Sequence, residues 1–258
     1  MTAPSTALTL TGERTLPGIA EENYWFRRHQ AAYEFLAGLI QAGTIGSGRL
    51  LEVGAGEGYG AALLAELVPV CALDYDPAAV AHLADRYPGL LPVRANLAAL
   101  PVADAALATV VALQVIEHVW DHRQFLAECA RVLRPGGWLV LSTPNRLTFS
   151  PGAGAADRPI NPFHTHEFTA AELAGLVRSA GFAEPLLYGL AAGPRLAELD
   201  RRHAGFVPAQ LAVPAEDWTE RLRADVDSVR TADFVLTGPG PAEELDDCLD
   251  LILLARSA

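Results

Sequence analysis

Three glycines at alternate positions, Gly54, Gly56 and Gly58, follow a short apolar run and precede a helix-forming run. Glycine lets the backbone turn tightly and approach a ligand where a Cβ atom would collide. A dinucleotide site needs the spacing G-x-G-x-x-G, which sets a pyrophosphate on a helix N-terminus. This chain has G-x-G-x-G, with an acid, Glu52, two residues before the first glycine. A carboxylate there would repel pyrophosphate and suits a ligand with ammonium and sulfonium groups, so a dinucleotide is the less favoured alternative.

The run Leu50–Gly60 resembles motif I of the class I S-adenosylmethionine (SAM) methyltransferases. The resemblance implies SAM as cofactor and S-adenosylhomocysteine as its product. In this family an acid at the end of the second strand accepts hydrogen bonds from both ribose hydroxyls, and Asp74 stands there. Tyr75 is placed to lie along the adenine. The family usually has another acid after the third strand, where this chain has Asn96, whose carbonyl oxygen can still accept from the adenine amino group.

The stretch Leu113–Val119 resembles the fourth-strand motif of the family, in which Gln114 would face the methionine end of the cofactor. An aromatic cluster at 24–26 would form a lid, with Arg27 or Arg28 meeting the methionine carboxylate. The alternative is an amphipathic helix that packs on the sheet. The resemblance implies a cofactor site made of Glu52, Gly54, Gly56, Asp74, Tyr75, Asn96, Leu97, Gln114 and Arg28.

A narrower resemblance spans nearly the whole chain. It is to the mycobacterial-type sugar O-methyltransferases of methylmannose polysaccharide synthesis, which add a 1-O-methyl group to a 3-O-methylated mannoside. This resemblance implies a small carbohydrate acceptor. The residues that carry it lie in the segments Leu10–Thr15, Glu22–Gln30, Gln114–Asp121, Ser142–Arg146, Thr148–Gly152 and Pro159–Thr165.

A sugar hydroxyl is a weak nucleophile at neutral pH, so a general base that titrates near pH 7 is expected, and histidine fits best. His164 is the first candidate because Asn161-Pro162-Phe163 gives it a stiff approach; alternatively it only bonds loop backbone. His118 is the second candidate, with a structural role at a helix start as its alternative. Glu117 could orient either histidine or pair with an arginine.

Residues of the N-terminal helix and of two long insertions are predicted to contact the acceptor. An exposed arginine is usually only solvated, and an aromatic residue of the N-terminal helix could equally pack on the sheet. No Asp, Glu and His cluster shows recognisable ligand spacing, so no metal is predicted, although some sugar methyltransferases of the wider class use Mg²⁺. The predicted acceptor-binding residues are Tyr24, Asn145, Arg146, His166 and Arg195.

Composition sets mild bounds on function. The net charge of −12 argues against a nucleic-acid partner and against docking on anionic lipid. The three widely spaced cysteines indicate a reducing compartment rather than disulfides or a zinc site. The N-terminus shows no signal-peptide pattern, and no apolar run is long enough to span a bilayer. We therefore expect a cytoplasmic protein without a membrane partner; a homodimer is compatible with these features.

Alternating apolar strands and amphipathic helices predict a Rossmann-like α/β fold, with a seven-stranded, mostly parallel sheet and helices on both faces. The 258 residues are expected to form a single domain with an N-terminal helix or lid at 1–45. Segments 142–168, after the fifth strand, and 191–247, between the sixth and seventh, exceed normal loop length and are expected on the substrate side. Helices are predicted near Pro194–His203 and Ala215–Arg230 within the second.

Three functions remain open from the sequence. The first is an O-methyltransferase that acts on a carbohydrate. The second is a SAM enzyme acting on another small acceptor, such as a quinone precursor or natural product. The third is a protein that binds SAM or NAD without catalysis. The polar segment 142–168, rich in Asn, Arg and His, favours the sugar acceptor over a hydrophobic one.

Overall fold

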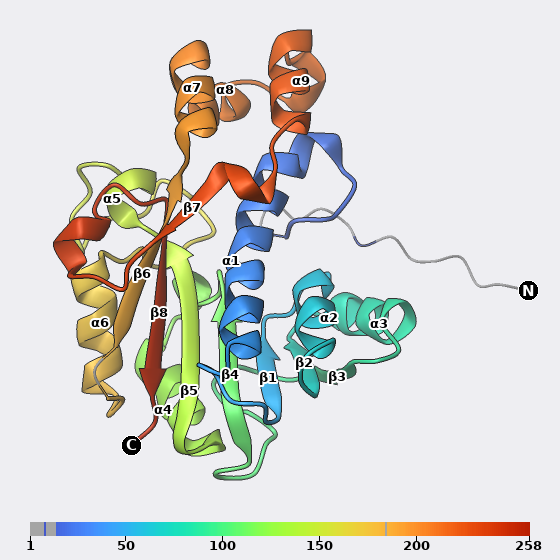
Figure 1. Ribbon diagram of the computed structural model, residues 1–258, viewed down its shortest axis with the longest axis vertical. Coiled ribbons are helices and arrows are strands. Elements are labelled where there is room, and N and C mark those ends of the chain that lie inside the picture. The colour runs from blue at the N-terminus through green and yellow to red at the C-terminus, as the bar shows by residue number, and fades with distance from the viewer. Residues whose placement is uncertain (1–7, 9–13, 184) are drawn as a thin grey trace, which may run out of the picture.

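The computed structural model describes residue 8 and residues 14–183 and 185–258, so most of the Leu10–Thr15 segment lies outside the described residues. These residues form a sheet flanked by helices (Figure 1). The strands are β1 Leu50–Val53, β2 Val70–Asp74, β3 Leu91–Arg94, β4 Leu107–Leu113, β5 Leu133–Pro144, β6 Leu186–Ala192, β7 Phe234–Thr237 and β8 Asp250–Arg256. The helices are α1 Asn23–Gln41, α2 Tyr59–Ala65, α3 Pro77–Arg86, α4 His122–Val132, α5 Arg146–Phe149, α6 Ala170–Ser179, α7 Pro194–His203, α8 Phe206–Leu211 and α9 Glu220–Asp227.

The strand order across the sheet is β3-β2-β1-β4-β5-β8-β6-β7. The first five of these strands are parallel to one another, and β8, β6 and β7 join by antiparallel pairing. The α/β prediction is confirmed, but the expectation of seven mostly parallel strands is wrong: the sheet has eight strands and is mixed. The additional strand, β7, lies inside the 191–247 segment. A four-residue edge strand that is only partly buried leaves too short a pattern to detect in sequence.

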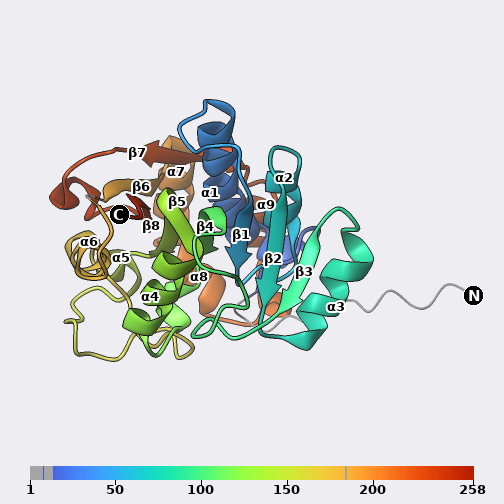
Figure 2. The ribbon, with the colours of Figure 1, turned by 90° about the horizontal axis from the view of Figure 1, so that it is seen from below.

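Two hydrophobic cores lie on opposite faces of the sheet, because successive strand residues point to opposite sides. Leu50 belongs to one core, which includes residues of α1, α2 and α3, and Leu51 belongs to the other, which includes residues of α4 and α6. Figure 2 shows α1 and α2 on one face and α4 and α6 on the other. Both faces are therefore covered, which explains why every residue of β4 is buried and nearly all are apolar.

Several helix ends are capped by side chains close by in the sequence. Asp76 caps α3 by accepting from the Ala78 N–H at 2.9 Å, with Pro77 as the first helical residue. Thr169 and Glu172 form a capping box at the start of α6. The prediction for α7 is confirmed, whereas the helix expected near Ala215–Arg230 is confined to α9 after a short 3₁₀ turn.

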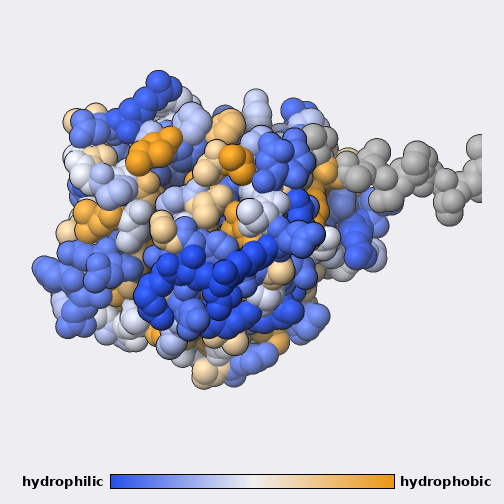
Figure 3. Space-filling view, turned by 90° about the horizontal axis from the view of Figure 1, so that it is seen from above, coloured by the Kyte–Doolittle hydropathy of each residue, from blue (hydrophilic) through white to orange (hydrophobic). Residues whose placement is uncertain are grey.

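One end of the molecule carries α7, α8 and α9 (Figure 1). Seen from this end, hydrophilic side chains cover most of the surface and hydrophobic ones form separate patches (Figure 3). No helix of the described residues is both long and apolar enough for a membrane span.

Candidate active site

Two cavities adjoin at the carboxyl ends of the parallel strands, where α/β folds bind ligands. The first cavity, of about 310 Å³, is bordered by the glycine loop after β1 and by the ends of β2 and β4. The second cavity, of about 470 Å³, lies between α1, the 3₁₀ turn after β4 and the segment 160–167. The residues that line both cavities are Arg14, Thr15, Arg28, His29, Gln114 and His118.

The glycine loop of the first cavity needs its glycines. Gly54 has a φ of +73°, and a Cβ atom there would lie 2.6 Å from Val115 Cγ2. Gly58 has a φ of +98°, and its Cβ would lie 2.2 Å from Leu83 Cδ2. Side chains are therefore excluded by both conformation and space. The loop brings bare backbone to the cavity, as a closely held ligand requires.

Asp74 is held facing the first cavity by two backbone bonds. Its carboxylate accepts from the Gly56 N–H and the Asp76 N–H, each at 2.8 Å. Tyr75, which is 67% exposed, and Leu97 line the same cavity. The fixed carboxylate can accept hydrogen bonds from the vicinal hydroxyls of a nucleoside. The exposed ring and the apolar side chain can pack against its flat base. Gly54, Gly56 and Gln114 also line this cavity, as predicted.

Two predicted cofactor residues lie elsewhere. Glu52 is fully buried and does not line the cavity; it accepts a hydrogen bond from the Tyr33 hydroxyl, and Tyr33 forms part of the wall instead. Asn96 is exposed, and its carbonyl oxygen accepts from the Ala98 N–H at 2.9 Å. Glu52 is thus linked to the cavity only through Tyr33, whose side chain it bonds.

Burial raises the pKa of Glu52 to about 7, against an ordinary value of 4.5. The folded protein therefore binds more protons than the unfolded chain between these two values, so the contribution of Glu52 to stability falls as the pH rises through this window. We expect Glu52→Gln to stabilise the protein relative to wild type by roughly 3 kcal/mol at pH 8 and hardly at all at pH 4. Urea unfolding at both pH values measures this difference. The exposed Glu66→Gln is the matched control, and an equal effect of Glu52→Gln at both pH values would contradict the assignment.

A buried ionic network forms the wall between the two cavities. Arg28 donates through both Nε, at 2.6 Å, and an Nη atom to the carboxylate of Asp250, and both side chains are 3% exposed. Gln114 donates from Nε2 to the same carboxylate at 3.2 Å and to Ser142 Oγ at 3.1 Å. Gln114 also adopts a φ of +56°, a strained conformation typical of functional sites. The charge of Arg28 is already paired with Asp250 in this structure. A contact between Arg28 and the methionine carboxylate of the cofactor therefore stays a prediction.

Two further residues that line both cavities come from the N-terminal segment. Arg14 forms an ion pair with Asp76 at 3.0 Å. The Thr15 hydroxyl lies 2.9 Å from the Tyr59 hydroxyl and 3.4 Å from His29 Nδ1. These contacts hold residues 14 and 15 against both cavities.

The second cavity contains a histidine whose orientation and tautomer follow from its neighbours. His164 Nδ1 lies 2.7 Å from Glu167 Oε1, and Nε2 lies 3.0 Å from Asn161 Nδ2. Asn161 accepts from the Phe163 N–H through its carbonyl oxygen, which fixes its amide as the donor to His164. Nε2 therefore carries the lone pair and Nδ1 carries the proton donated to Glu167. A carboxylate that orients an imidazole in this way is a typical arrangement for a general base.

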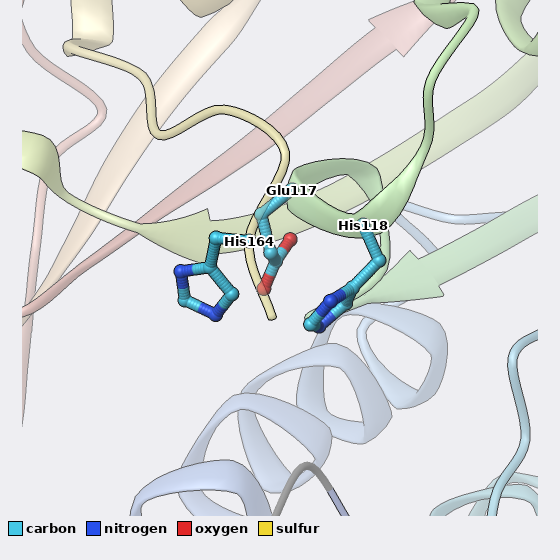
Figure 4. A group of neighbouring side chains, drawn as sticks. All are labelled: Glu117, His118 and His164. Atoms are coloured by element: carbon cyan, nitrogen blue, oxygen red, sulfur yellow. The ribbon is translucent and has the colours of Figure 1, made fainter. Parts of the chain in front are cut away.

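His118 and Glu117 lie beside this histidine (Figure 4). The His118 ring centroid is 5.0 Å from that of His164, and His118 Nδ1 is 3.2 Å from the Phe163 carbonyl oxygen. Glu117 is 1% exposed, and burial raises its pKa to about 7. Its carboxylate lies between the two imidazoles (Figure 4). The three predicted catalytic residues are thus brought together.

Ligand atoms of Glu117, His118 and His164 all lie within 4.8 Å of one another, close enough to hold one cation. Such a cation would have to displace the Asn161 amide from His164 Nε2. Ligand spacing along the chain could not indicate this cluster as a cation site, because His118 and His164 stand 46 residues apart.

The predicted acceptor residues in α1 and near α5 do not line the second cavity. Tyr24 is buried between Trp25, Phe206 and Phe234, with ring centroids 5.1–5.7 Å away. Asn145 is also buried, and its amide donates to the carbonyls of residues 245, 246 and 248. These side chains hold the fold together, so their polar groups are not available to an acceptor.

The other three predicted acceptor residues are also engaged elsewhere. Arg146 is buried and bonds Glu172 at 2.7 Å. The His166 ring packs on Phe168 with centroids 4.4 Å apart. Arg195 lies on α7 and pairs with Asp233 at 2.6 Å. Sequence patterns identified the segments around the acceptor cavity but not which side chains point into it.

Sequence reasoning missed several residues that line the cavities. Glu167 gave a usable signal, because it stands three residues after His164. Asp250 also gave one, since it is an acid that begins the otherwise apolar run of β8. Phe149 and Thr15 gave none, and only the fold brings them to the second cavity.

The fold and the glycine-lined cavity define an α/β protein that binds an adenosyl ligand. Residues 51–141 match the family model described as a methyltransferase domain. A probable S-adenosylmethionine-dependent methyltransferase of Mycolicibacterium smegmatis is 52% identical over 96% of this chain and 95% of its own length. A ubiquinone biosynthesis O-methyltransferase of Burkholderia pseudomallei is 31% identical over 54% of this chain and 56% of its own.

The fold matches solved structures as well. A SAM-dependent methyltransferase of Thermotoga maritima, described as a possible histamine N-methyltransferase, superposes with a TM-score of 0.60 at 17% identity, covering 92% of this chain and 95% of that one. This likeness shows the fold alone. With the sequence relatives it identifies the chain as a member of the class I SAM-dependent methyltransferase family, and S-adenosylmethionine is its cofactor.

Proposed function

We propose that this enzyme is an O-methyltransferase that methylates a sugar hydroxyl, the 1-hydroxyl of a 3-O-methylated mannoside being the acceptor we favour. The observation that carries the proposal is the oriented pair His164–Glu167 in a cavity that shares a wall with the cofactor cavity. A nucleophile as weak as an alcohol needs such a base, whereas an amine or a thiolate does not.

The residues of this chain have separate tasks in that reaction. When bound, SAM supplies an electrophilic methyl group on a sulfonium sulfur. Asp74 binds and orients the cofactor in the first cavity, and the second cavity holds the acceptor. Once the acceptor hydroxyl displaces the Asn161 amide from it, His164 Nε2 takes the proton of that hydroxyl, and Glu167 stabilises the imidazolium that forms. His118, which lines both cavities, marks the place where acceptor and cofactor meet. Alignment of the reacting groups supplies much of the rate enhancement.

The lining of the second cavity suits a carbohydrate. Trp25 and Phe149, with ring centroids 6.5 Å apart, offer aromatic surface to the apolar face of a sugar ring. Glu22, Asn161 and His164 offer hydrogen-bonding groups. A few polar groups in a largely apolar cavity are typical of specific small-molecule sites.

A methyl-transfer assay with labelled SAM tests the proposal directly. We expect transfer to a 3-O-methylated mannoside and little to the unmethylated sugar. The control panel contains quinone precursors, because the apolar part of the lining, Trp25, Phe149 and Phe163, would also accept an aromatic ring. The distant relatives named for ubiquinone biosynthesis support this second candidate. Methyl transfer to a quinone precursor but to no sugar would reject the sugar proposal in favour of this second candidate.

Asp74→Ala is expected to weaken S-adenosylhomocysteine binding roughly 10²-fold or more, because two charge-assisted hydrogen bonds to the ribose are lost. The thermal shift caused by S-adenosylhomocysteine measures this loss. The exposed Asp85→Ala of α3 is the control and should keep the shift. Because Asp74 also bonds the Gly56 and Asp76 amides, the unliganded melting temperature is compared first. A full ligand shift in Asp74→Ala would refute the assignment.

A further inference from the structure

We propose that Glu117 binds a second hydroxyl group of the acceptor, so that the acceptor is a vicinal diol of which one hydroxyl is methylated. The inference rests on the proposed function, because it takes the second cavity as the acceptor site. It goes further by assigning a role to a carboxylate that neither the base nor the cofactor needs.

The first observation is an unsatisfied oxygen. Glu117 is 1% exposed and lines the second cavity, and among the described residues its Oε2 makes no hydrogen bond of normal geometry, the buried Thr143 hydroxyl being the neighbouring donor. Buried polar groups are almost always paired, and an unpaired one costs about 1–3 kcal/mol, more when it is charged. A hydroxyl of the acceptor is a donor that would satisfy this oxygen.

The second observation is how close to one another the side chains lie that could accept a hydrogen bond from the substrate. Atoms of Glu117, His118 and His164 lie within 4.8 Å of one another, and the Glu117 carboxylate is placed between the two rings (Figure 4). A hydroxyl has a single proton to donate. The hydroxyl that gives its proton to His164 therefore cannot also satisfy Glu117, and a neighbouring hydroxyl on the next carbon is the nearest second donor.

Glu167 also has one oxygen without a partner, but it serves a different group. Its other oxygen bonds His164 Nδ1, whereas the basic Nε2 is on the other side of the ring. Glu117 is thus the carboxylate that can accept from a second hydroxyl of the substrate while the reacting hydroxyl gives its proton to His164 Nε2.

Both candidate acceptors carry the two neighbouring hydroxyls that this role of Glu117 requires. A 3-O-methylated mannoside keeps its neighbouring 1- and 2-hydroxyls, and a catechol-type quinone precursor also carries two adjacent hydroxyls. A compound whose second hydroxyl is absent or already methylated would leave Glu117 unpaired. Sites built to bond a hydroxyl reject analogues without it by factors that can reach about 10⁴.

Calorimetric titration of the full chain loaded with S-adenosylhomocysteine tests the inference without turnover. The matched pairs are 3-O-methylmannose against its 2-deoxy analogue, and 3,4-dihydroxybenzoate against 3-hydroxybenzoate. We expect the wild-type protein to prefer the diol of at least one pair by roughly 10-fold or more, the equivalent of one charge-assisted hydrogen bond. Glu117→Gln should reduce this ratio and Glu117→Ala should abolish it. Glu66→Gln, which changes an exposed carboxylate that lines neither cavity, should keep it.

The outcomes separate this inference from the proposed function. Equal binding of diol and deoxy compound in both pairs, or an unchanged ratio in both Glu117 variants, would overturn it. Stoichiometric binding of Zn²⁺ or Mn²⁺ alone that Glu117→Gln abolishes would also overturn it, because the carboxylate would then face a cation. A diol preference with methyl transfer only to 3,4-dihydroxybenzoate would uphold the inference and reject the sugar proposal. Methylation of the sugar without a preference for the diol in binding would uphold the proposed function and reject this inference.

Discussion

His164→Ala is expected to lower kcat roughly 10²–10⁴-fold, the usual contribution of a positioned general base. The loss should appear in the chemical step, because His164 lines the acceptor cavity and not the cofactor cavity. Affinity for S-adenosylhomocysteine should therefore stay at the wild-type value. Single-turnover methyl transfer and the ligand-induced thermal shift, measured on the same preparation, separate these two quantities.

Glu167→Gln provides the matched test of orientation. It keeps the shape of the side chain but removes the charge that stabilises a protonated His164, so an intermediate loss is expected. His118→Ala tests the competing assignment of the base. If His164→Ala retained turnover while His118→Ala lost it, the base would be His118.

Arg28→Ala is expected to destabilise the protein by about 3–5 kcal/mol, because Asp250 would keep a buried charge without its partner. For a chain of this size that corresponds to a fall in melting temperature of roughly 2–4 °C per kcal/mol. Thermal unfolding without ligand measures the effect. Arg28 also packs over Phe149, with its guanidinium carbon 4.3 Å from the ring centroid, and this contact is lost too.

The double variant Arg28→Met, Asp250→Leu distinguishes the buried charge from the lost packing. Removing both charges should recover much of the stability, since a buried ion pair contributes little net stability compared with apolar residues of similar volume. Arg28→Ala with wild-type stability would contradict the assignment. The same series tests whether Arg28 meets the methionine carboxylate, through a loss of S-adenosylhomocysteine affinity beyond the loss of stability.

The parallel half of the fold could be predicted from the sequence because its signals are local. The glycine spacing after β1, the Asp76 cap and the Thr169 capping box each depend on residues within one turn of chain. The antiparallel edge could not, because β7 is short and its pairing with β6 depends on contacts between distant segments. A strand of this kind is defined by its neighbour rather than by its own pattern.

The residues of the site also fall into those that could be predicted from the sequence and those that could not. Asp74 was predictable because strand ends in a parallel sheet meet at one edge, and the structure places it at the first cavity. Asn145 and Arg146 stand in a segment that borders the acceptor cavity, but the chain uses their donors to bond its own backbone and Glu172. The direction of a side chain in an irregular segment depends on tertiary contacts that no spacing rule contains.

The wall shared by the two cavities offers a route by which binding in one could affect binding in the other. Arg28, Gln114 and Asp250 form one bonded unit, so a ligand that shifts this unit from one side alters the surface met from the other. Thermodynamic linkage then requires reciprocity: the factor by which the cofactor changes affinity for the acceptor equals the factor by which the acceptor changes affinity for the cofactor. Cooperativity of this heterotropic kind would need neither a second subunit nor a separate effector site.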